Sequence, residues 1–407
     1  MILQIKRNIP GIAVLLVSLL IQLAICKGET FAISDSTVRV QELRIDLHSA
    51  KTGDGMSLVD SIKYIPLETN NESEFSTISQ LEITEKYYII LDKRLNTLLF
   101  FNRNGSFYRK ISKNSKDIPT PFKSLGRFAV DTSRNILLVD DYGSSNLYEF
   151  NLNGDFSHIV NKKMAATDYT FFKDLKVCYH LEISPAMNDS GAYITIYNAA
   201  TEEKRDSYLF SNSAQHNLDA IDIPNHFYRS DGGQVFFTHP FDYTIYELDT
   251  NGLPQGRYKI ILPLSNTLPT DFLIDPTLNG KRRDYITSNK SIIYSLRNVY
   301  ISGDWLSFYT MNSVQGSTFL YNLATGNLYN LKETKDPLIG LPITEWLAPI
   351  LGVNQGALIS AIPFLSLKKK YEEIPKSQRN GFFPEELTAL MNRKSHNFIL
   401  RLSYFKQ

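Results

Sequence analysis

A short phrase that recurs about every fifty residues constrains the fold of this chain more than any other feature. It reads FNRNG at Phe101–Gly105, FNLNG at Phe150–Gly154 and LDTNG at Leu248–Gly252, with the related forms YNAATE at Tyr197–Glu202 and YNLATG at Tyr321–Gly326. Each phrase lies between two apolar runs. Because Asn-Gly and similar pairs adopt positive φ readily, each phrase predicts the turn of a β-hairpin.

The spacing of the phrase predicts the architecture. The first four phrases in chain order begin 49, 47 and 51 residues apart. A repeat of ~40–50 residues that holds short strands separated by turns is typical of a β-propeller blade. Aromatic residues make up 12% of the chain, which favours strands over helices. We therefore predict an all-β fold, a six-bladed β-propeller of four-stranded antiparallel blades.

The strands between the phrases divide into blades. We place the first five at about 77–111, 124–160, 168–210, 221–262 and 291–331, and the sixth from about residue 338. The interval from Leu248 to Tyr321 is 73 residues, so we predict a long insertion at 263–290. A second insertion is predicted at 368–395, where FFPEELTALMNR begins with a helix-start signature. Loops of this length are usually functional or mobile.

The two ends of the repeat region predict how the ring closes. The last blade is one strand short, while SIKYIPLET at Ser61–Thr69 is a strand without a blade. A ring leaves no long free edge if the N-terminal strand completes the last blade. We therefore predict that Ile62–Leu67 pairs in the same sheet as Phe398–Tyr404.

The N-terminus has the features of an export signal. Lys6 and Arg7 precede a 14-residue apolar run at Ile12–Ile25, which suits a signal peptide better than a membrane span. The run ends at Cys26 in a pattern that resembles a bacterial lipobox, although Ile25 stands where Gly, Ala or Ser is usual. We predict a signal peptide at 1–25 and lipidation of Cys26, with ordinary cleavage nearby as the alternative.

These features divide the chain and place it in the cell. Residues 26–57 are predicted as a tether with an early strand at about 38–47, and residues 58–407 as the propeller. The protein is expected to be exported, to the periplasm or the outer membrane. The only other cysteine, Cys178, is expected to be a buried strand residue, so no disulfide framework is predicted.

The charge of the chain excludes some partners. The formal net charge is +1, and removal of Lys6 and Arg7 with the signal peptide leaves 1 − 2 = −1. A nearly neutral protein has no whole-molecule electrostatic reason to bind nucleic acid or an anionic membrane. We therefore expect no nucleic-acid partner, contact with a membrane only through the lipid anchor, and a monomer.

Four stretches together resemble a known family. IKYIPLET, YYIILD, FNRNG and the closing HNFILRLSYFK resemble exported six-bladed β-propellers of Gram-negative gut bacteria, over roughly Asp60–Lys406. These propellers are often lipoproteins and are similar to TolB-like and NHL-like propellers. The resemblance implies the fold, the export and the insertions, and it implies no general activity. One departure is the segment Asn114–Gly126, which has a single glycine where the family commonly has a Gly-rich stretch.

The sequence contains no recognisable catalytic motif. A GxSxG elbow, a Walker A loop and a GxGxxG fingerprint are all missing. His180 and Glu182 form an H-x-E pair, but the PCxxC half of a deaminase site does not follow. The histidines are interpreted as isolated strand or loop residues: His48, His158, His180, His216, His226, His239 and His396. No catalytic, cofactor-binding or metal-binding residue is therefore predicted.

Two further groups of residues leave alternatives open. Asp92, Asp131 and Asp140-Asp141 lie at strand ends, where they either cap turns or supply oxygen ligands for a Ca²⁺-type metal on the propeller axis. The aromatic residues of Phe241-Asp242-Tyr243 and Trp346 lie in predicted connections, where they either bind a ligand or pack between blades. A run of lysines, Lys368–Lys370, is predicted as solvated loop charge.

Two functions remain. The first is a cell-envelope binding or scaffold propeller without catalysis, which recognises a glycan, a peptide or a protein partner. The alternative is a metal-dependent (Ca-type) hydrolase or lyase with its site at the central pore. Export, the two insertions and the missing catalytic motifs favour the first function.

Overall fold

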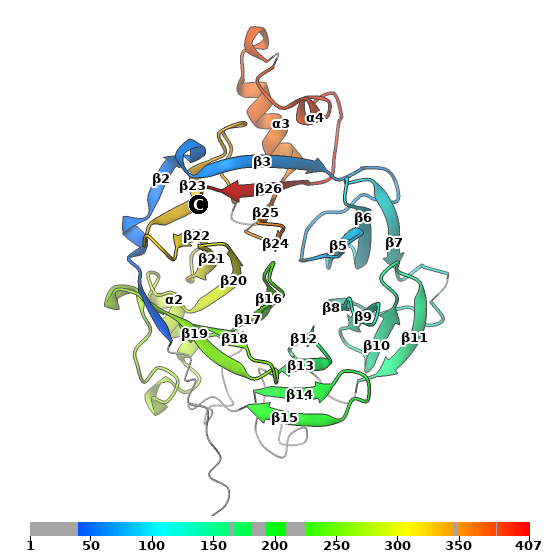
Figure 1. Ribbon diagram of the computed structural model, residues 1–407, viewed down its shortest axis with the longest axis vertical. Coiled ribbons are helices and arrows are strands. Elements are labelled where there is room, and N and C mark those ends of the chain that lie inside the picture. The colour runs from blue at the N-terminus through cyan, green and yellow to red at the C-terminus, as the bar shows by residue number, and fades with distance from the viewer. Residues whose placement is uncertain are drawn as a thin grey trace, which may run out of the picture. The chain divides into compact units, whose positions relative to one another are not determined.

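Six sheets surround a central axis (Figure 1). The structure is a computed structural model, and it describes residues 40–116, 118–162, 166–180, 193–208, 225–345, 349–379 and 381–407. In each sheet the consecutive strands run antiparallel, and the first of them lies nearest the axis. The predicted all-β six-bladed propeller is confirmed. The predicted signal peptide, the lipidation site Cys26 and its neighbour Ile25 lie outside the described residues.

Blades one to three follow the predicted four-stranded pattern. Blade one consists of β4 (Gln80–Ile83), β5 (Tyr87–Asp92), β6 (Thr97–Asn102) and β7 (Phe107–Ser112). Blade two consists of β8 (Leu125–Asp131), β9 (Ile136–Asp141), β10 (Asn146–Phe150) and β11 (Phe156–Asn161). Blade three consists of β12 (Asp168–Phe172), β13 (Leu175–Tyr179), β14 (Ile194–Asn198) and β15 (Lys204–Tyr208).

Blades four and five each gain a fifth strand from the N-terminal segment. Blade four consists of β16 (Phe227–Arg229), β17 (Val235–Thr238), β18 (Thr244–Leu248) and β19 (Pro254–Ile261), and β1 (Gln41–Arg44) pairs with β19 in parallel. Blade five consists of β20 (Ser295–Ser302), β21 (Trp305–Met311), β22 (Gly316–Asn322) and β23 (Leu328–Lys335), and β2 (Lys51–Asp54) pairs with β23 in parallel. The expectation of four strands per blade is therefore too low for these two blades.

Blade six is closed by both ends of the chain. It contains β24 (Gly352–Asn354), β25 (Ala357–Ile362), β26 (Ile399–Phe405) and, as its outer strand, β3 (Val59–Pro66). Antiparallel pairing of β3 with β26 places Ile65 opposite Leu400 and Ile62 opposite Ser403. The predicted ring closure is confirmed.

Both insertions are folded. The first holds η3 (Leu264–Asn266), η4 (Pro276–Leu278) and α2 (Arg282–Ser288), and the second holds α3 (Phe364–Glu373), η5 (Lys376–Gln378) and α4 (Glu385–Thr388). Two further short helices of the described chain, η1 (Leu47–Ser49) and η2 (Gly55–Ser57), lie next to β2 in the N-terminal segment. In Figure 1, α3 and α4 lie outside β3, on the perimeter of the ring rather than over its centre. Among the described residues, no helix is long and apolar enough to cross a membrane.

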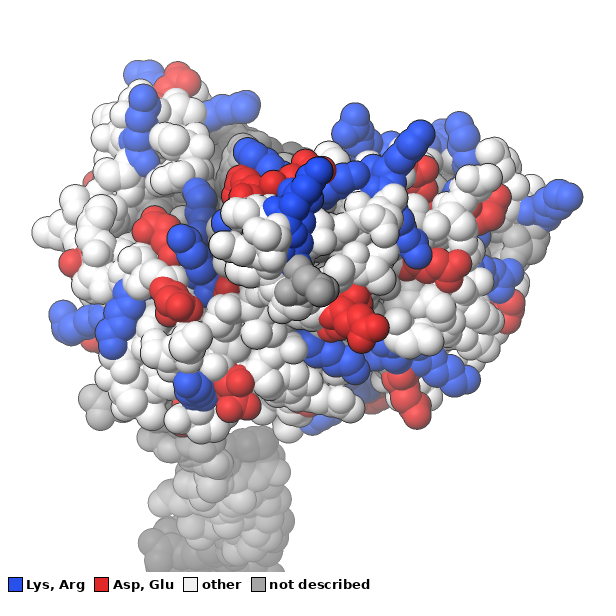
Figure 2. Space-filling view, turned by 90° about the horizontal axis from the view of Figure 1, so that it is seen from above, with Lys and Arg blue, Asp and Glu red and all other residues white. Residues whose placement is uncertain are grey.

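The lysine run lies on a helix rather than in a loop. Lys368–Lys370 belong to α3, which begins at Phe364 after Pro363, four residues before the predicted insertion. The apolar side of α3 buries Phe364 and Leu367 against blade six. This packing stabilises a helix that the lysine-rich composition did not indicate. The face in Figure 2 carries Lys, Arg, Asp and Glu intermixed, with no large patch of one sign.

The core lies between neighbouring blades. The side chains of β5 are all buried, and one apolar cluster joins Ile89 and Phe100 of blade one to Phe128 and Val139 of blade two. Strands that are covered on both faces by other sheets become continuously apolar, as the sequence YYIILD is. Packing between blades, rather than within one blade, therefore holds the ring together.

The recurring phrases are the turns between the third and fourth strands of blades one to five. In the first of them, Gly105 donates its N–H to the carbonyl of Asn102 at 2.8 Å and has φ +89°. Its carbonyl accepts the N–H of Glu68 at 2.9 Å, directly after the closing strand β3. This turn therefore contributes to ring closure as well as to its own hairpin.

We predict that Gly105→Ala destabilises the protein more than Gly143→Ala does. Both glycines have φ +89°, so each alanine costs about 1–2 kcal/mol in backbone strain. A Cβ on Gly105 would also lie 2.3 Å from the carbonyl oxygen of Pro66, whereas nothing lies within 4 Å at Gly143. Forced displacement of a packed strand adds about 1–3 kcal/mol. Urea unfolding of the two variants measures the difference, and equal losses would show that the turn does not press on β3.

Candidate functional site

The strand-end carboxylate of Asp92 caps turns. It accepts six hydrogen bonds, from the backbone N–H groups of Ser76, Thr77, Arg94 and Leu95 and from the hydroxyls of Ser76 and Thr77, at 2.6 to 3.2 Å. Burial alone would raise the pKa of Asp92, but these hydrogen bonds hold it below its usual value. The carboxylate oxygens of Asp92 already accept hydrogen bonds from the protein, as expected of a residue that caps turns.

Asp131 and Asp141 have the same role. Asp131 accepts from Ser133 and Arg134 within its own turn, and Asp141 accepts the N–H of Ser124 at 2.7 Å. Burial would raise the pKa of Asp131, and the bonds to Ser133 and Arg134 lower it below its usual value. Of the two alternatives for these aspartates, the structure supports turn capping.

Two of the histidines meet around one tyrosine, which the sequence did not indicate. The rings of His226 and His239 lie 4.2 Å and 5.7 Å from the ring of Tyr179, between blades three and four. Burial lowers the pKa of His226 to about 4, so this imidazole is neutral at physiological pH. His180 lies at the end of β13 with Nε2 2.8 Å from the hydroxyl of Thr195.

The other described histidines do not lie together in one site. His48, His158 and His396 lie in separate parts of the ring, and His216 and Glu182 fall outside the described residues. In the part of the chain that the structure describes, no three His, Cys, Asp or Glu side chains are placed to hold a metal ion.

The aromatic loop after β17 packs onto the first insertion. Phe241 lies 5.6 Å from the ring of Phe272, and the hydroxyl of Tyr243 donates to the carbonyl of Ile293 at 2.6 Å and accepts the N–H of Leu268 at 2.8 Å. For Phe241 and Tyr243 the structure supports packing rather than ligand binding. Trp346 lies outside the described residues.

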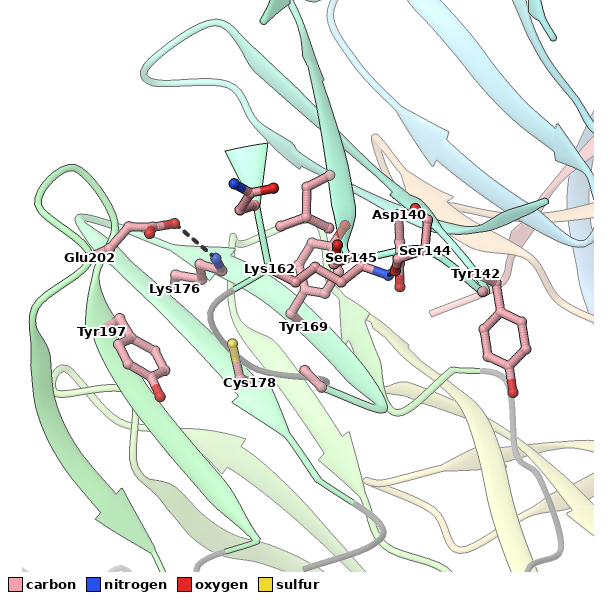
Figure 3. Close-up of a pocket in the computed structure, with 14 residues that line it drawn as sticks. Asp140, Tyr142, Ser144, Ser145, Lys162, Tyr169, Lys176, Cys178, Tyr197 and Glu202 are labelled. Atoms are coloured by element: carbon pink, nitrogen blue, oxygen red, sulfur yellow. Dashed lines mark hydrogen bonds and ion pairs between the residues drawn. The ribbon is translucent and has the colours of Figure 1, made fainter. Parts of the chain in front are cut away.

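A cavity of about 530 Å³ lies between blades two and three (Figure 3). We call it the inter-blade pocket. Blade two contributes the end of β9, the turn 142–145 and the end of β11, and blade three contributes β13, β14 and the turn after β14. Its lining residues are Asp140, Tyr142, Gly143, Ser144, Ser145, Leu147, Asn161, Lys162, Ala166, Tyr169, Lys176, Cys178, Tyr197 and Glu202.

One ion pair holds the blade-two side of the pocket. Lys162 pairs with Asp140, and its ammonium also donates to the carbonyls of Asp141 at 2.8 Å and Ser144 at 2.9 Å. All three contacts lie around the turn from β9 to β10. Lys162 therefore fixes the shape of this turn, and with it the position of Tyr142.

A second ion pair stands on the blade-three side. The Nζ of Lys176 lies 3.3 Å from the carboxylate of Glu202, and both side chains are largely buried. Figure 3 shows the two ion pairs on opposite sides of the pocket, with Tyr169 and Cys178 between them. The pocket thus has charged walls of both signs and a less polar floor.

The floor offers no activated nucleophile. Burial raises the pKa of the Cys178 thiol to about 11, so almost none of it is thiolate at neutral pH. The thiol is buried on β13, as predicted. Tyr169 is buried with its hydroxyl donating to the carbonyl of Leu138 at 3.1 Å, and burial raises its pKa well above the usual value. These groups suit contact with a ligand and not covalent catalysis.

Two tyrosines flank the pocket. Tyr142 is 72% exposed at the tip of its turn, which is unusual for a large aromatic side chain. Tyr197 is half-buried on β14, on the opposite side of the pocket in Figure 3. Tyrosine presents a large apolar ring together with a polar hydroxyl, which suits ligands that have both kinds of surface.

A second cavity, of about 350 Å³, lies on the propeller axis. It is lined by residues of all six innermost strands, β4, β8, β12, β16, β20 and β24 or the residue before it. We call it the central channel. Neither Asp92, Asp131 nor Asp140-Asp141 lines it, so the strand-end aspartates do not converge on the axis.

Only part of the inter-blade pocket can be recognised in the sequence. Asp140 is recognisable as a strand-end aspartate, Cys178 as a buried strand residue and Tyr197 as the first residue of a turn phrase, whereas Tyr142 and Lys162 belong to no motif. The available signal is Tyr142 beside Asp140-Asp141 in a Gly-Ser turn. This signal does not reveal the pocket, because nothing local shows that blade three faces this turn.

Comparisons with known proteins place the chain in a family. A family described as "Domain of unknown function (DUF4934)" matches residues 44–382. No protein with a curated description matches the chain.

Several solved structures are similar. A "putative exported protein" from Bacteroides fragilis is 18% identical, with 90% of this chain and 100% of that chain covered and a TM-score of 0.72. A member of the DUF4221 family from Bacteroides vulgatus is 11% identical, with 86% and 97% covered and a TM-score of 0.42. BamB from Moraxella catarrhalis is 13% identical, with 74% and 75% covered and a TM-score of 0.35. At this identity the first likeness concerns the fold alone, and the other two are too distant to support an argument.

Proposed function

The chain belongs to the DUF4934 family, whose description names no activity, and we propose from its geometry that it is an exported cell-envelope propeller that binds a small glycan in the inter-blade pocket. The observation behind the proposal is a pocket with tyrosines at its sides and two opposed ion pairs in its walls. A glycan is one of the three ligand classes expected from the sequence. The experiment below also detects the other two, a peptide and a protein partner.

The size and lining of the pocket support a small molecule. A volume of about 530 Å³ falls in the usual range of ~300–1,000 Å³ for small-molecule sites. A sugar ring has apolar C–H faces and a rim of hydroxyls. The faces can stack on Tyr142 or Tyr197, and the hydroxyls can bond to carboxylate, ammonium, amide and hydroxyl groups in the walls.

The polar groups of the pocket are held in place before any ligand arrives. Lys162 has three partners around one turn, and Lys176 is fixed by Glu202. Binding to a rigid site avoids the entropy cost of ordering long side chains. Such a site suits a neutral ligand with many hydroxyls, because its charges are already paired and an extra charge would lack a partner.

The alternative function, a Ca-type hydrolase or lyase in the central channel, receives less support. The wall of the channel includes two arginines, Arg229 and Arg297. Of its two carboxylates, Glu82 and Asp168, the second is already paired with a third arginine, Arg127. Guanidinium groups repel a divalent cation, which prefers a surplus of oxygen ligands.

We predict that Tyr142→Ala weakens glycan binding about 5- to 30-fold, the usual effect of removing an aromatic anchor that contributes about 1–2 kcal/mol. The side chain is 72% exposed, so its removal leaves the stability unchanged. The mature protein is first tested on a glycan array. The affinity of the best glycan is then measured by calorimetry for the wild type and the variant.

The matched control is Tyr108→Ala, a 44% exposed tyrosine on β7 of another blade, which is expected to bind like the wild type. Lys176→Met is expected to weaken binding from the opposite wall. If the affinity for the best glycan is the same in Tyr142→Ala, Lys176→Met and the wild type, the glycan does not bind in the inter-blade pocket and the proposal is wrong. Binding of peptides or proteins, with no glycan retained, would overturn the ligand class.

A further inference from the structure

The central channel carries charges of opposite sign on opposite blades. Among the described residues, four charged side chains line it: Glu82 on β4, Asp168 on β12, Arg229 on β16 and Arg297 on β20. Glu82 belongs to blade one and Arg229 to blade four, which face each other across the ring (Figure 1). Which of the four charges the protein itself already uses decides what the channel can bind.

Two of the four charges are already used by the protein. The Oδ1 of Asp168 lies 2.9 Å from the guanidinium of Arg127, and its Oδ2 accepts the N–H of His226 at 2.7 Å. The Nε of Arg297 lies 3.4 Å from the hydroxyl of Ser295, and this arginine has a further interaction besides. We therefore assign neither Asp168 nor Arg297 a part in ligand binding.

Arg229 is held in place by uncharged groups. Its Nη2 donates to the carbonyl of Phe171 and lies 3.4 Å from the hydroxyl of Thr170, both on β12 of the adjacent blade three. No other acceptor in the described parts of the chain bonds to this guanidinium, and no described carboxylate forms an ion pair with it. Its Nε and Nη1 therefore remain as donors on a side chain that is already positioned.

Glu82 and Arg229 influence each other without being in contact. Burial raises the pKa of Glu82, and the positive charge of Arg229 is the largest of the effects that lower it. The two groups are therefore within electrostatic reach of each other. Yet no ion pair joins them in the described part of the chain, and both line the same cavity of about 350 Å³. The channel thus holds a carboxylate and a guanidinium, each without a bonded counter-charge.

We propose that the central channel binds a small zwitterion with an apolar side chain, a free amino acid or a short peptide, whose carboxylate bonds to Arg229 and whose ammonium bonds to Glu82. A guanidinium offers paired N–H donors that match a carboxylate, and a carboxylate accepts charge-assisted hydrogen bonds from an ammonium. Charges inside a protein attract each other more strongly than charges in water, so both contacts are favourable here.

The remaining lining of the channel agrees with this ligand class. A simple anion would pair with Arg229 but would be repelled by Glu82, and a simple cation would meet the reverse situation. Only a ligand with both charges satisfies both groups. Tyr228, Tyr300 and Tyr309 supply aromatic surface for an apolar side chain. The volume of about 350 Å³ lies at the lower end of the ~300–1,000 Å³ usual for small-molecule sites.

The test is calorimetry of the whole mature protein with L-phenylalanine and with the dipeptide Ala-Phe as probes. Each probe is compared with its N-acetylated form, which lacks the ammonium, and with its C-terminal amide, which lacks the carboxylate. We expect at least one probe to bind, and each of its blocked forms to bind at least about tenfold more weakly, because one charge-assisted contact is lost. Tighter binding of phenylalanine identifies a free amino acid as the ligand, and tighter binding of Ala-Phe identifies a peptide.

Two variants assign the two charges. Arg229→Gln should weaken binding at least about tenfold and should no longer distinguish the probe from its amide. Glu82→Gln should weaken binding to a similar degree and should no longer distinguish the probe from its N-acetylated form. The matched controls are Arg283→Gln on α2 and Glu85→Gln after β4, which change exposed residues outside the channel lining and should bind like the wild type.

Thermal unfolding of each variant without probe shows whether it folds. If Arg229→Gln loses its fold with its bond to β12, the blocked probes on the wild type and the Glu82→Gln variant decide. The proposal is overturned if neither probe binds, if the blocked forms bind as tightly as the probes, or if Glu82→Gln binds like the wild type. The site is separate from the inter-blade pocket, so either proposal can fail without the other.

Discussion

Asp336→Asn is expected to lower the free energy of unfolding by about 3–5 kcal/mol, because it leaves a buried arginine without a counter-charge. Asp336 pairs with Arg401 at 3.0 Å, and the two side chains are 0% and 1% exposed. The same carboxylate oxygen accepts the hydroxyl of Tyr64 at 2.7 Å. Tyr64 belongs to β3, Arg401 to β26, and Asp336 follows β23, so one carboxylate joins both chain ends and blade five.

The other hydrogen-bond partners of Arg401 make the loss of stability larger. Its guanidinium also donates to Ser360 at 3.1 Å and to the carbonyls of Pro342 and Ile343, so it cannot turn towards solvent. In the variant it must stay buried and charged, or the outer part of blade six must open. Chemical denaturation followed by fluorescence measures the change.

Two variants act as controls for this prediction. Glu373→Gln breaks the exposed pair with Lys370, which lies at 3.4 Å, and should change stability by less than about 1 kcal/mol. Tyr64→Phe removes a single hydrogen bond and should cost about 1.5–3 kcal/mol, the range for a bond to a charged group. A loss for Asp336→Asn no larger than for Glu373→Gln would contradict the prediction.

Removal of residues up to 67 is expected to prevent stable folding, whereas a chain that begins at residue 40 should fold. The shorter chain lacks β1, β2 and β3, and β26 then has an unpaired edge. In the intact protein Tyr64, Ile65 and Leu67 are 4%, 3% and 0% exposed. Burial of such side chains contributes about 1.5–3 kcal/mol each, so their loss removes much of the ~5–15 kcal/mol typical of a whole domain.

Circular dichroism and thermal unfolding of the two truncated proteins measure this effect. A synthetic peptide of residues 58–68 should restore part of the stability when it is added to the shorter protein, because it can pair with β26. A third truncation that begins at residue 58 separates the contribution of β3 from that of β1 and β2. A cooperative transition in the shorter protein without peptide, at an unchanged temperature, would show that β3 is dispensable.

The repeat and the closure could be predicted because they depend on local chemistry. A turn such as FNRNG needs residues that tolerate positive φ, and these stand next to each other in the sequence. The strand at Val59–Pro66 was apolar and lay outside every repeat, so the count of strands indicated its partner. The place of Asp92 and Asp131 at strand ends predicted turn capping only as one of two alternatives, and their hydrogen bonds in the structure decided between the two.

The strand β2 and the helix α3 could not be predicted in the same way, whereas β1 lies within the early strand predicted at 38–47. The side chains of Lys51–Asp54 are all exposed, so β2 has no apolar pattern, and only the backbone of β23 makes it a strand. The helix α3 is rich in lysine, and it forms because Phe364 and Leu367 find a buried surface on blade six. Tertiary contacts decided both, as they commonly do for segments with weak local preferences.

The sequence by itself determined the blade count, the hairpin turns and the insertions, because each depends on preferences within a few neighbouring residues. It also determined the pairing of the two chain ends, because the count of strands left one strand without a blade and one blade short of a strand. The tertiary structure alone decided the sites. Asp140 and Glu202 face the same pocket although 62 positions separate them, and Glu82 and Arg297 share the channel from opposite parts of the chain. Side chains on different blades become neighbours only when the ring closes, so no local sequence pattern predicts that they share a site.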